Sequence, residues 1–456
     1  MLVSHIQLVN RFRWVYCQLE NLRHCFPPSV QRTLDELPES LDGTYERVLR
    51  EIKKPNRGHA LRLLECLVVA IRPLRVEELA EVLAVDFEDA EGMPKLNASW
   101  RWEDQEQALL SSCSSLISIV DNGDGDDGRD HDSRAVQFSH FSVKEFLTSP
   151  RLATPNRDVS NYQIVLESAH TIMAHACLSV LLRSDDQVIP TDVRNNSPLA
   201  EYAAEHWATH AQFEDVSSYL RRAMEYLFDV DKPYFAAWLE LHDIDHYLPS
   251  MFYYFTPLPK SPAGPLYYAA LCGFQDLAEH IIVKHPQEVN AHGGYYVTAL
   301  VAALVGGHFP LAELLHRRGS SVDPRGFCDN TPLHSAALLG DLEMIQVLLE
   351  YKADINARAN DDVTPLFRAV YTGGREVVRL LVESGADPNI PANGDKAPLH
   401  LASKTGDSEV VRLLLDHGAD VGAVDGSGKT AFQLALAEGH DEIVTLLTAR
   451  GTDDSS

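Results

Sequence analysis

The sequence predicts a mainly α-helical chain whose C-terminal part is a solenoid of repeats. An apolar residue recurs there at a step of 33 or 34 residues (300 − 266 = 34; 333 − 300 = 33), at Leu266, Leu300, Leu333, Leu366, Leu399 and Phe432. Each is followed by an alanine after three residues and a glycine after seven, as Leu333 is by Ala336 and Gly340. Self-similarity over six units at this period predicts stacked units that share one core.

Each unit has the pattern of two helices joined by a glycine turn. Thr331 can cap the first helix with its hydroxyl, and Pro332 suits the first helical position, where no backbone donor is missed. Gly340 can take the positive φ that ends this helix. Ile345 and Leu348 then lie on one face of the second helix, and that face is buried only when neighbouring units stack.

These motifs resemble the ankyrin repeat. Thr331-Pro332-Leu333-His334, the glycine that ends the helix and the closing Gly385-Ala386-Asp387 or Gly418-Ala419-Asp420 carry the resemblance. We therefore expect about six ankyrin repeats within residues 261–456. The resemblance implies a concave surface of loop tips and first helices, on which proteins of this family bind protein partners.

Length and charge limit the function classes. A chain of 456 residues is too long for one ordinary core and predicts two or three domains. Its formal net charge of −27 argues against binding to nucleic acid or to an anionic membrane, because both need a basic face. No stretch approaches the roughly 20 apolar residues of a membrane span. We expect protein partners, with no nucleic acid and no membrane.

Cysteine usage and the N-terminus predict the compartment. The seven cysteines contain no Cys-x-x-Cys pair, which is typical of reduced thiols. The first residues, Met1-Leu2-Val3-Ser4-His5, lack the basic and apolar regions of a signal peptide. We expect a cytoplasmic protein, with the nucleus as the alternative.

The region before the repeats has the element order of a winged-helix domain over residues 58–150. Helices are expected over 59–71, 76–84, 103–112 and 141–147, and β-like runs over 116–120 and 135–140. DNA binding is disfavoured, because the third helix begins with acidic residues and six aspartates occupy the loop between the β-like runs, at positions 121, 124, 126, 127, 130 and 132.

Further motifs resemble the part of fungal NACHT/STAND proteins that follows their ATPase. They are Phe12-Arg13-Trp14, Arg72-Pro73-Leu74, the run from His140 to Leu147 and the run from Pro198 to Trp207. The resemblance implies a helical remnant over 1–57, the winged helix, and a helical connector over 151–260 that caps the solenoid. The ATPase core that precedes Phe12 in that family is absent from this sequence, so we expect the C-terminal half of such a protein.

Three strings imitate sites of known chemistry, and each has a structural interpretation that we prefer. Gly426–Thr430 resembles the end of a phosphate-binding loop, but Ala423 stands where the first glycine is needed and the string is in repeat register. His206 and His210 are one helical turn apart, but Trp207 stands where a zinc protease has glutamate, and no third ligand follows. A calcium loop that starts at Gly123 would end in arginine at position 134. We predict no catalytic, cofactor-binding or metal-binding residue.

The predicted partner-binding residues lie five places after each repeat leucine. They are Leu271, Val305, Leu338, Tyr371 and Lys404, flanked in the loops by Phe327, Asn330, Asn360 and Asp361. Four of the five row positions are apolar or aromatic, and repeat stacking would set them in one line. The alternative is that this row packs against neighbouring helices.

Two functions are compatible with these features. In the first, the chain is a non-enzymatic protein–protein interaction module, the sensor or scaffold half of a fungal STAND-type signalling or immunity receptor. In the second, it is the regulatory half of an ATP-dependent NACHT switch whose NTPase domain is missing from this sequence or supplied in trans.

Overall fold

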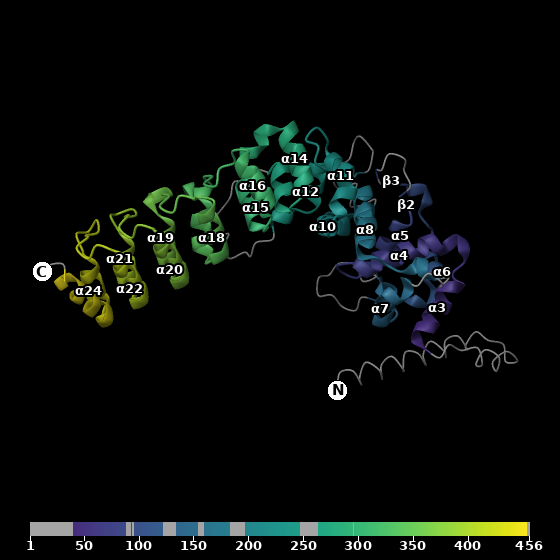
Figure 1. The fold of residues 1–456 in the computed structure, drawn as a ribbon, viewed down its shortest axis with the longest axis horizontal. Coiled ribbons are helices and arrows are strands. Elements are labelled where there is room, and N and C mark those ends of the chain that lie inside the picture. The colour runs from purple at the N-terminus through teal and green to yellow at the C-terminus, as the bar shows by residue number, and fades with distance from the viewer. Residues whose placement is uncertain are drawn as a thin grey trace. The chain divides into compact units, whose positions relative to one another are not determined.

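The computed structural model describes residues 40–87, 93, 95–121, 134–153, 159–182, 197–246, 263–294 and 296–453. They form two compact units that divide between Ile244 and Asp245. Figure 1 shows the elements of each unit. The predicted remnant up to residue 39, most of the aspartate-rich loop and the predicted boundary at residue 260 lie outside the described residues.

The first unit begins with short helices and strands. The helices are α3 (Leu41–Glu51), α4 (Arg57–Val69), α5 (Val76–Val82), α6 (Gln105–Cys113) and α7 (Phe141–Thr148). The strands are β1 (Leu74–Arg75), β2 (Val85–Asp86), β3 (Lys95–Leu96), β4 (Ile117–Asp121) and β5 (Arg134–Phe138). Short 3₁₀ turns η2 (Lys54–Asn56), η3 (Ala98–Trp100), η4 (Ser114–Leu116), η5 (Pro150–Ala153) and η6 (Ser160–Tyr162) connect them. The predicted helices and β-like runs of this region are all present, with ends that differ by one or two residues.

A three-stranded antiparallel sheet in the order β1-β5-β4 completes this part. Val136 of β5 is paired with Leu74 of β1 on one side and with Ile119 of β4 on the other. Strands β2 and β3 form a separate antiparallel pair. Three helices followed by a β-hairpin make this region a winged-helix fold, and β1 adds a third strand that the hydrophobic pattern did not predict.

Four further helices make up the rest of the first unit. They are α8 (Leu166–Leu181), α10 (Ala200–Ala211), α11 (Val216–Leu227) and α12 (Tyr234–Leu241), and the turn η7 (Ile244–His246) follows at the division between units. Helix α8 packs against α4, α10 and α11, so it joins the winged-helix region to the connector. Trp207 and Trp238 are buried and meet edge to face at 5.3 Å. These aromatic side chains are core residues.

The second unit consists of six helix pairs within residues 263–294 and 296–453 (Figure 1). We call the first members of the pairs the first helices: α13 (Pro265–Leu271), α15 (Ala299–Val305), α17 (Pro332–Leu339), α19 (Pro365–Thr372), α21 (Pro398–Thr405) and α23 (Ala431–Glu438). The second helices are α14 (Gln275–Lys284), α16 (Phe309–Arg317), α18 (Leu342–Glu350), α20 (Arg375–Glu383), α22 (Ser408–Asp416) and α24 (Asp441–Asp453). The 3₁₀ turns η9 (Pro286–Asn290), η10 (Phe327–Asp329) and η11 (Asn360–Asp362) lie in the connecting loops.

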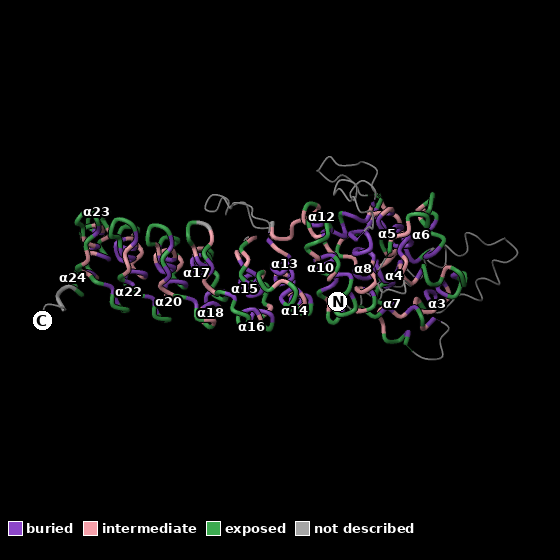
Figure 2. The backbone as a smooth tube through the Cα atoms, turned by 90° about the horizontal axis from the view of Figure 1, so that it is seen from above, coloured by how far each residue is buried: buried purple, intermediate pink, exposed green. Residues whose placement is uncertain are grey.

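The repeat positions do what their chemistry predicts. Leu333 and Ala336 are buried, and Gly340 ends α17 with φ of 76°. Thr364 accepts the N–H of Phe367 at 3.1 Å and so caps α19. Buried residues gather where helices of successive repeats meet, and exposed residues follow the loops (Figure 2).

Turn-to-turn hydrogen bonds repeat along the second unit. Backbone N–H groups of Asp354, Asp387 and Asp420 donate to the side chains of Asp323, Asn356 and Asn389 at 2.9, 2.9 and 2.8 Å. The polar turn that closes each repeat therefore binds the equivalent turn of the repeat before it.

Within the described ranges, every helix is too short or too polar to cross a bilayer.

Candidate functional site

The predicted row occupies the C-terminal part of the first helices. Val305 and Tyr371 are 39% and 60% exposed, and Lys404 is exposed as well. Leu271 and Leu338 are half-buried. If the row were fully buried, its residues would serve only to pack against neighbouring helices. Tyr371 departs most from that alternative, because the residue is mostly exposed to solvent.

The row is divided between the second and third repeats. Helix α13 packs on α15, and α17, α19, α21 and α23 pack on one another in order. Helix α15 meets the following repeat mainly through the second helix α18. The structure therefore groups Leu338, Tyr371 and Lys404 and sets Leu271 and Val305 apart from them.

The flanking loop residues have different environments. Asn330 is half-buried, and its Oδ1 accepts a hydrogen bond from Arg368 at 3.3 Å. Asn360 is exposed. Asp361 is also exposed, but its carbonyl and carboxylate accept the backbone and side-chain N–H groups of Asn393 at 2.7 and 3.1 Å. Asp361 therefore links two neighbouring loops. The side chain of Phe327 lies outside the described part of the structure.

Two exposed or half-buried residues of the first helices were missed by the sequence reasoning. Leu436 of α23 is 59% exposed, and Arg368 lies one turn before Tyr371 on α19. The row at five places after each leucine excludes both. The signal that could have found Arg368 is charge counted helix by helix, because α19 and α21 carry basic residues and no acidic ones.

The repeat histidines connect the first helices to the loops that follow. In His334, Nδ1 accepts the backbone N–H of Thr331 at 3.2 Å, and Nε2 donates to the carbonyl of Val363 at 2.9 Å. His400 repeats this with Ala397 and Ala423. Burial lowers the pKa of His334 to about 4, so the ring is neutral at pH 7. Each of these histidines therefore links the start of its own helix to the following loop.

The string that resembles a phosphate-binding loop is a repeat turn. Its backbone N–H groups at Ser427 and Lys429 donate to the Asp425 carboxylate at 2.9 and 3.0 Å. Thr430 then caps α23. Because a carboxylate already occupies the donors that a phosphate would need, this turn is unsuited to hold a nucleotide.

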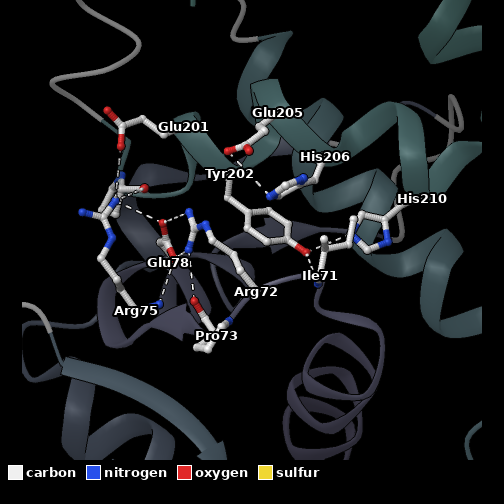
Figure 3. A network of polar contacts seen from close by, with 11 residues as sticks. Ile71, Arg72, Pro73, Arg75, Glu78, Glu201, Tyr202, Glu205, His206 and His210 are labelled. Atoms are coloured by element: carbon white, nitrogen blue, oxygen red, sulfur yellow. Dashed lines mark hydrogen bonds and ion pairs between the residues drawn. The ribbon is translucent and has the colours of Figure 1, made fainter. Parts of the chain in front are cut away.

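A buried polar network joins the winged-helix region to α10 (Figure 3). Arg72 donates to both carboxylate oxygens of Glu78 at 2.8 and 2.7 Å, and the backbone N–H of Arg75 donates to the same carboxylate at 2.8 Å. Burial alone would raise the pKa of Glu78, but these hydrogen bonds outweigh it and lower the pKa. The guanidinium of Arg72 also lies 5.0 Å from the centre of the Tyr202 ring.

Both histidines of α10 contact Tyr202 of this network, His206 through a ring-to-ring contact at 4.7 Å. His210 contacts the hydroxyl of Tyr202 through Nε2 and Nδ1 of His170 through its own Nδ1, both at 2.9 Å. Tyr202 also accepts the N–H of Ile71 at 3.2 Å. Burial lowers the pKa of His210 to about 3, with the nearby His170 and His206 adding to the shift. In the described residues no group of three potential ligands could hold a metal ion.

Glu65 of α4 is a buried acid at the packing of α4 on α8. The residue is 5% exposed, and its Oε1 accepts the Ser168 hydroxyl at 3.2 Å. Its Oε2 is buried without a hydrogen-bond partner. Burial raises the pKa of Glu65 to about 7, with Ser168 and Arg62 opposing the shift. Sequence patterns gave no sign of this residue, because acidic side chains on helices are usually exposed.

Comparisons with known proteins agree with these two folds. The winged helix domain of GPI inositol-deacylase matches residues 45–156. The ankyrin-repeat model matches in three copies, over residues 266–359, 299–392 and 366–455. The chain therefore contains ankyrin repeats preceded by a winged-helix domain.

One relative comes from a fungus. The azaphilone pigments biosynthesis cluster protein L of Monascus ruber is 29% identical over 300 residues, which cover 63% of this chain. The matched part spans 61% of that relative, which is less than two thirds of its length.

Proposed function

We propose that this chain is a non-enzymatic protein–protein interaction module whose ankyrin repeats bind a protein partner on their concave face. The observation that carries the proposal is the exposure of Tyr371 in a row of first-helix positions with Leu338 and Lys404. Aromatic side chains at the centre of an interface contribute much of its binding energy. Exposure of such a ring to water on a helix surface is unfavourable unless a partner covers it.

We further propose that the chain is the sensor or scaffold half of a fungal STAND-type receptor. Three features support this: the winged helix, the helical connector and the ankyrin repeats follow one another in the order found in that family. The fungal relative is consistent with the same origin. The motif around His140 also has a structural explanation, since its ring accepts the N–H of Ser142 and so caps α7.

The alternative function is the regulatory half of an ATP-dependent NACHT switch. The network that joins Arg72 and Glu78 to Tyr202 favours it, because it couples the winged helix to the connector that leads toward the repeats. Discovery of an in-frame phosphate-binding loop upstream in the gene would select this alternative. A stop codon directly upstream would leave the first function and the form of the alternative in which the NTPase domain is supplied in trans.

A photo-crosslinking experiment tests the binding face. A photoreactive residue replaces Tyr371 in the full chain, and the matched control carries it at Lys284, an exposed position of the second helix α14. We expect a protein adduct at position 371 and none at position 284, with the partner identified by mass spectrometry and rebound in purified form.

The double substitution Leu338→Lys and Tyr371→Lys provides the second arm. We expect loss of partner binding with a nearly unchanged melting temperature, because Tyr371 is mostly exposed and Leu338 is only half-buried. A much lower melting temperature would show that the row is core. Full binding by a normally folded double variant would refute the proposed face.

A further inference from the structure

The first helices of the repeats have almost no acidic residues. Among the first helices that the structure describes, Glu438 of α23 is the only acidic residue, and α19 and α21 carry Arg368 and Lys404. Each second helix contains at least one aspartate or glutamate. In a chain with 66 acidic and 39 basic residues, the first-helix side of the repeats therefore carries little negative charge on its helices.

Among the described residues, the basic residues near the first helices lack a paired carboxylate. In the described part of the structure, no carboxylate lies within ion-pair distance of Arg368, Lys396, Lys404 or Lys429. The arginines of the second helices differ. Arg375 pairs with Asp407 at 3.0 Å, and Arg412 pairs with Glu442 at 3.0 Å.

Several acidic residues of the neighbouring loops already have partners. Asp329 pairs with Arg325 at 3.5 Å, and Asp362 pairs with Arg358 at 3.3 Å. Asp425 accepts the backbone N–H groups of its own turn, as described above. Because these carboxylates already have partners, they are less able to neutralise the positive charges of Arg368 and Lys404.

Arg368 and Lys404 occupy first-helix positions next to the exposed Tyr371. Arg368 is three residues before Tyr371 on α19, which places the two side chains on one face of the helix. Lys404 holds the position equivalent to Tyr371 on α21, and α21 packs directly on α19. Two adjacent repeats thus carry an exposed aromatic residue and two basic residues at neighbouring positions of their first helices.

We propose that repeats three to six bind an acidic peptide segment of a protein partner, with its apolar side chain against Tyr371 and its carboxylates at Arg368 and Lys404. The inference rests on the proposed function and specifies the partner's chemistry. Charge complementarity favours such a segment, because attraction at Arg368 and Lys404 adds to apolar burial at the ring. A nucleic acid fits less well, since the chain's net charge of −27 repels a polyanion at long range.

The test selects peptides from a random twelve-residue phage library on the full-length protein. We expect enrichment of peptides that combine aspartate or glutamate with an aromatic or aliphatic residue. A synthetic copy of the best peptide should bind with an affinity that falls as salt rises. Arg368→Glu and Lys404→Glu should each weaken its Kd by about tenfold or more, because hydrogen bonds to charged groups are among the stronger polar contacts.

The matched control is Lys284→Glu, which makes the same change of charge on the exposed surface of α14. We expect it to leave peptide affinity within about twofold of the unsubstituted chain, because the site is on a different helix face and long-range charge effects are screened. Circular dichroism of all three variants checks that the repeats remain folded.

Other outcomes separate this inference from the proposed function. If the enriched peptides are neutral or basic and fail to bind the Tyr371→Lys variant, the inference of an acidic partner is wrong and the proposed binding face is supported. Peptides that are insensitive to every first-helix variant, or no enrichment at all, would count against both. A labelled single-stranded oligonucleotide is also tested as a competitor of the bound peptide. If it displaces the peptide at a lower concentration than free peptide does, the surface binds nucleic acid and the acidic-peptide inference is wrong.

Discussion

The buried carboxyl of Glu65 gives the sharpest quantitative prediction. Glu65→Gln replaces the acid with a neutral side chain of the same shape. Stability from protonated Glu65 is fully present below its unfolded pKa of 4.5 and is lost as pH rises through its folded pKa of about 7. At neutral pH the acid therefore destabilises the first unit, whereas glutamine has no such penalty.

The magnitude follows from the difference between the two pKa values of Glu65. Because the pKa of Glu65 is higher in the folded than in the unfolded state, Glu65 lowers the free energy of unfolding relative to a side chain that does not titrate. The loss is about 1 kcal/mol at pH 5 and about 3 kcal/mol at pH 7.5. The free energy of unfolding of Glu65→Gln, relative to the unsubstituted chain, should then rise by about 2 kcal/mol between these pH values. His210 and the other buried histidines titrate in both proteins, so their contributions cancel in this difference.

Tryptophan fluorescence during denaturant unfolding is the assay. All five tryptophans precede residue 245, so the signal reports on the first unit alone. Glu145→Gln on α7 is the matched control, because Glu145 is exposed, and we expect no pH-dependent difference from it. A difference for Glu65→Gln that stays constant from pH 5 to pH 7.5 would falsify the assignment of Glu65 as a buried acid with a raised pKa.

Three further predictions concern other sites. Gly340→Ala should cost about 1 kcal/mol from its positive φ alone, while Gly406→Ala should cost more, because its Cβ would lie 2.6 Å from the His440 ring; calorimetric melting of the repeats compares them. Tyr202→Phe should destabilise the first unit by about 1–3 kcal/mol, since it leaves the buried His210 ring and the part-buried N–H of Ile71 without their partner. Equal fluorescence midpoints would contradict this. We expect neither the unsubstituted chain nor Lys429→Ala to bind labelled ATP above background. Micromolar ATP binding by the unsubstituted chain that Lys429→Ala abolishes would refute the assignment of this string as a repeat turn.

The repeat unit could be predicted from sequence because its signals are local and periodic. The step from Leu300 to Leu333, the caps at threonine and proline and the glycine turn each specify one piece of backbone, and they agree from unit to unit. The winged helix followed in the same way from its order of helices and β-like runs. Strand β1 was missed because two residues, Leu74 and Arg75, are too short a run to show alternation.

The buried network could not be predicted, because its partners are distant in sequence. Ile71 and Tyr202 are 131 positions apart, and His170 and His210 are 40 apart. Periodicity placed His210 on a helix, where the structure has it in α10. It could not show which groups would satisfy the imidazole, since that depends on how α8, α10 and the segment after α4 pack together.

The candidate surface was predictable in part for a related reason. Register placed Tyr371 and Lys404 at equivalent positions, but exposure depends on how neighbouring repeats pack. The same register placed Val305 in the row, whereas the structure separates it from Leu338, because α15 meets the next repeat mainly through α18. A periodic sequence therefore predicts which residues are equivalent but not which of them are contiguous.

The division of charge between the helices of a repeat is consistent with a division of roles. Second helices carry ion pairs between successive repeats, such as Arg375 with Asp407, and their charges are compensated within the chain. First helices stack through small and apolar residues, such as the buried Ala369 and Ala402, and need no charge for this. Arg368 donates to Asn330 across a repeat boundary, but in the described residues neither Arg368 nor Lys404 pairs with a carboxylate. A binding partner is the simplest physical reason for such positive charge in so acidic a chain.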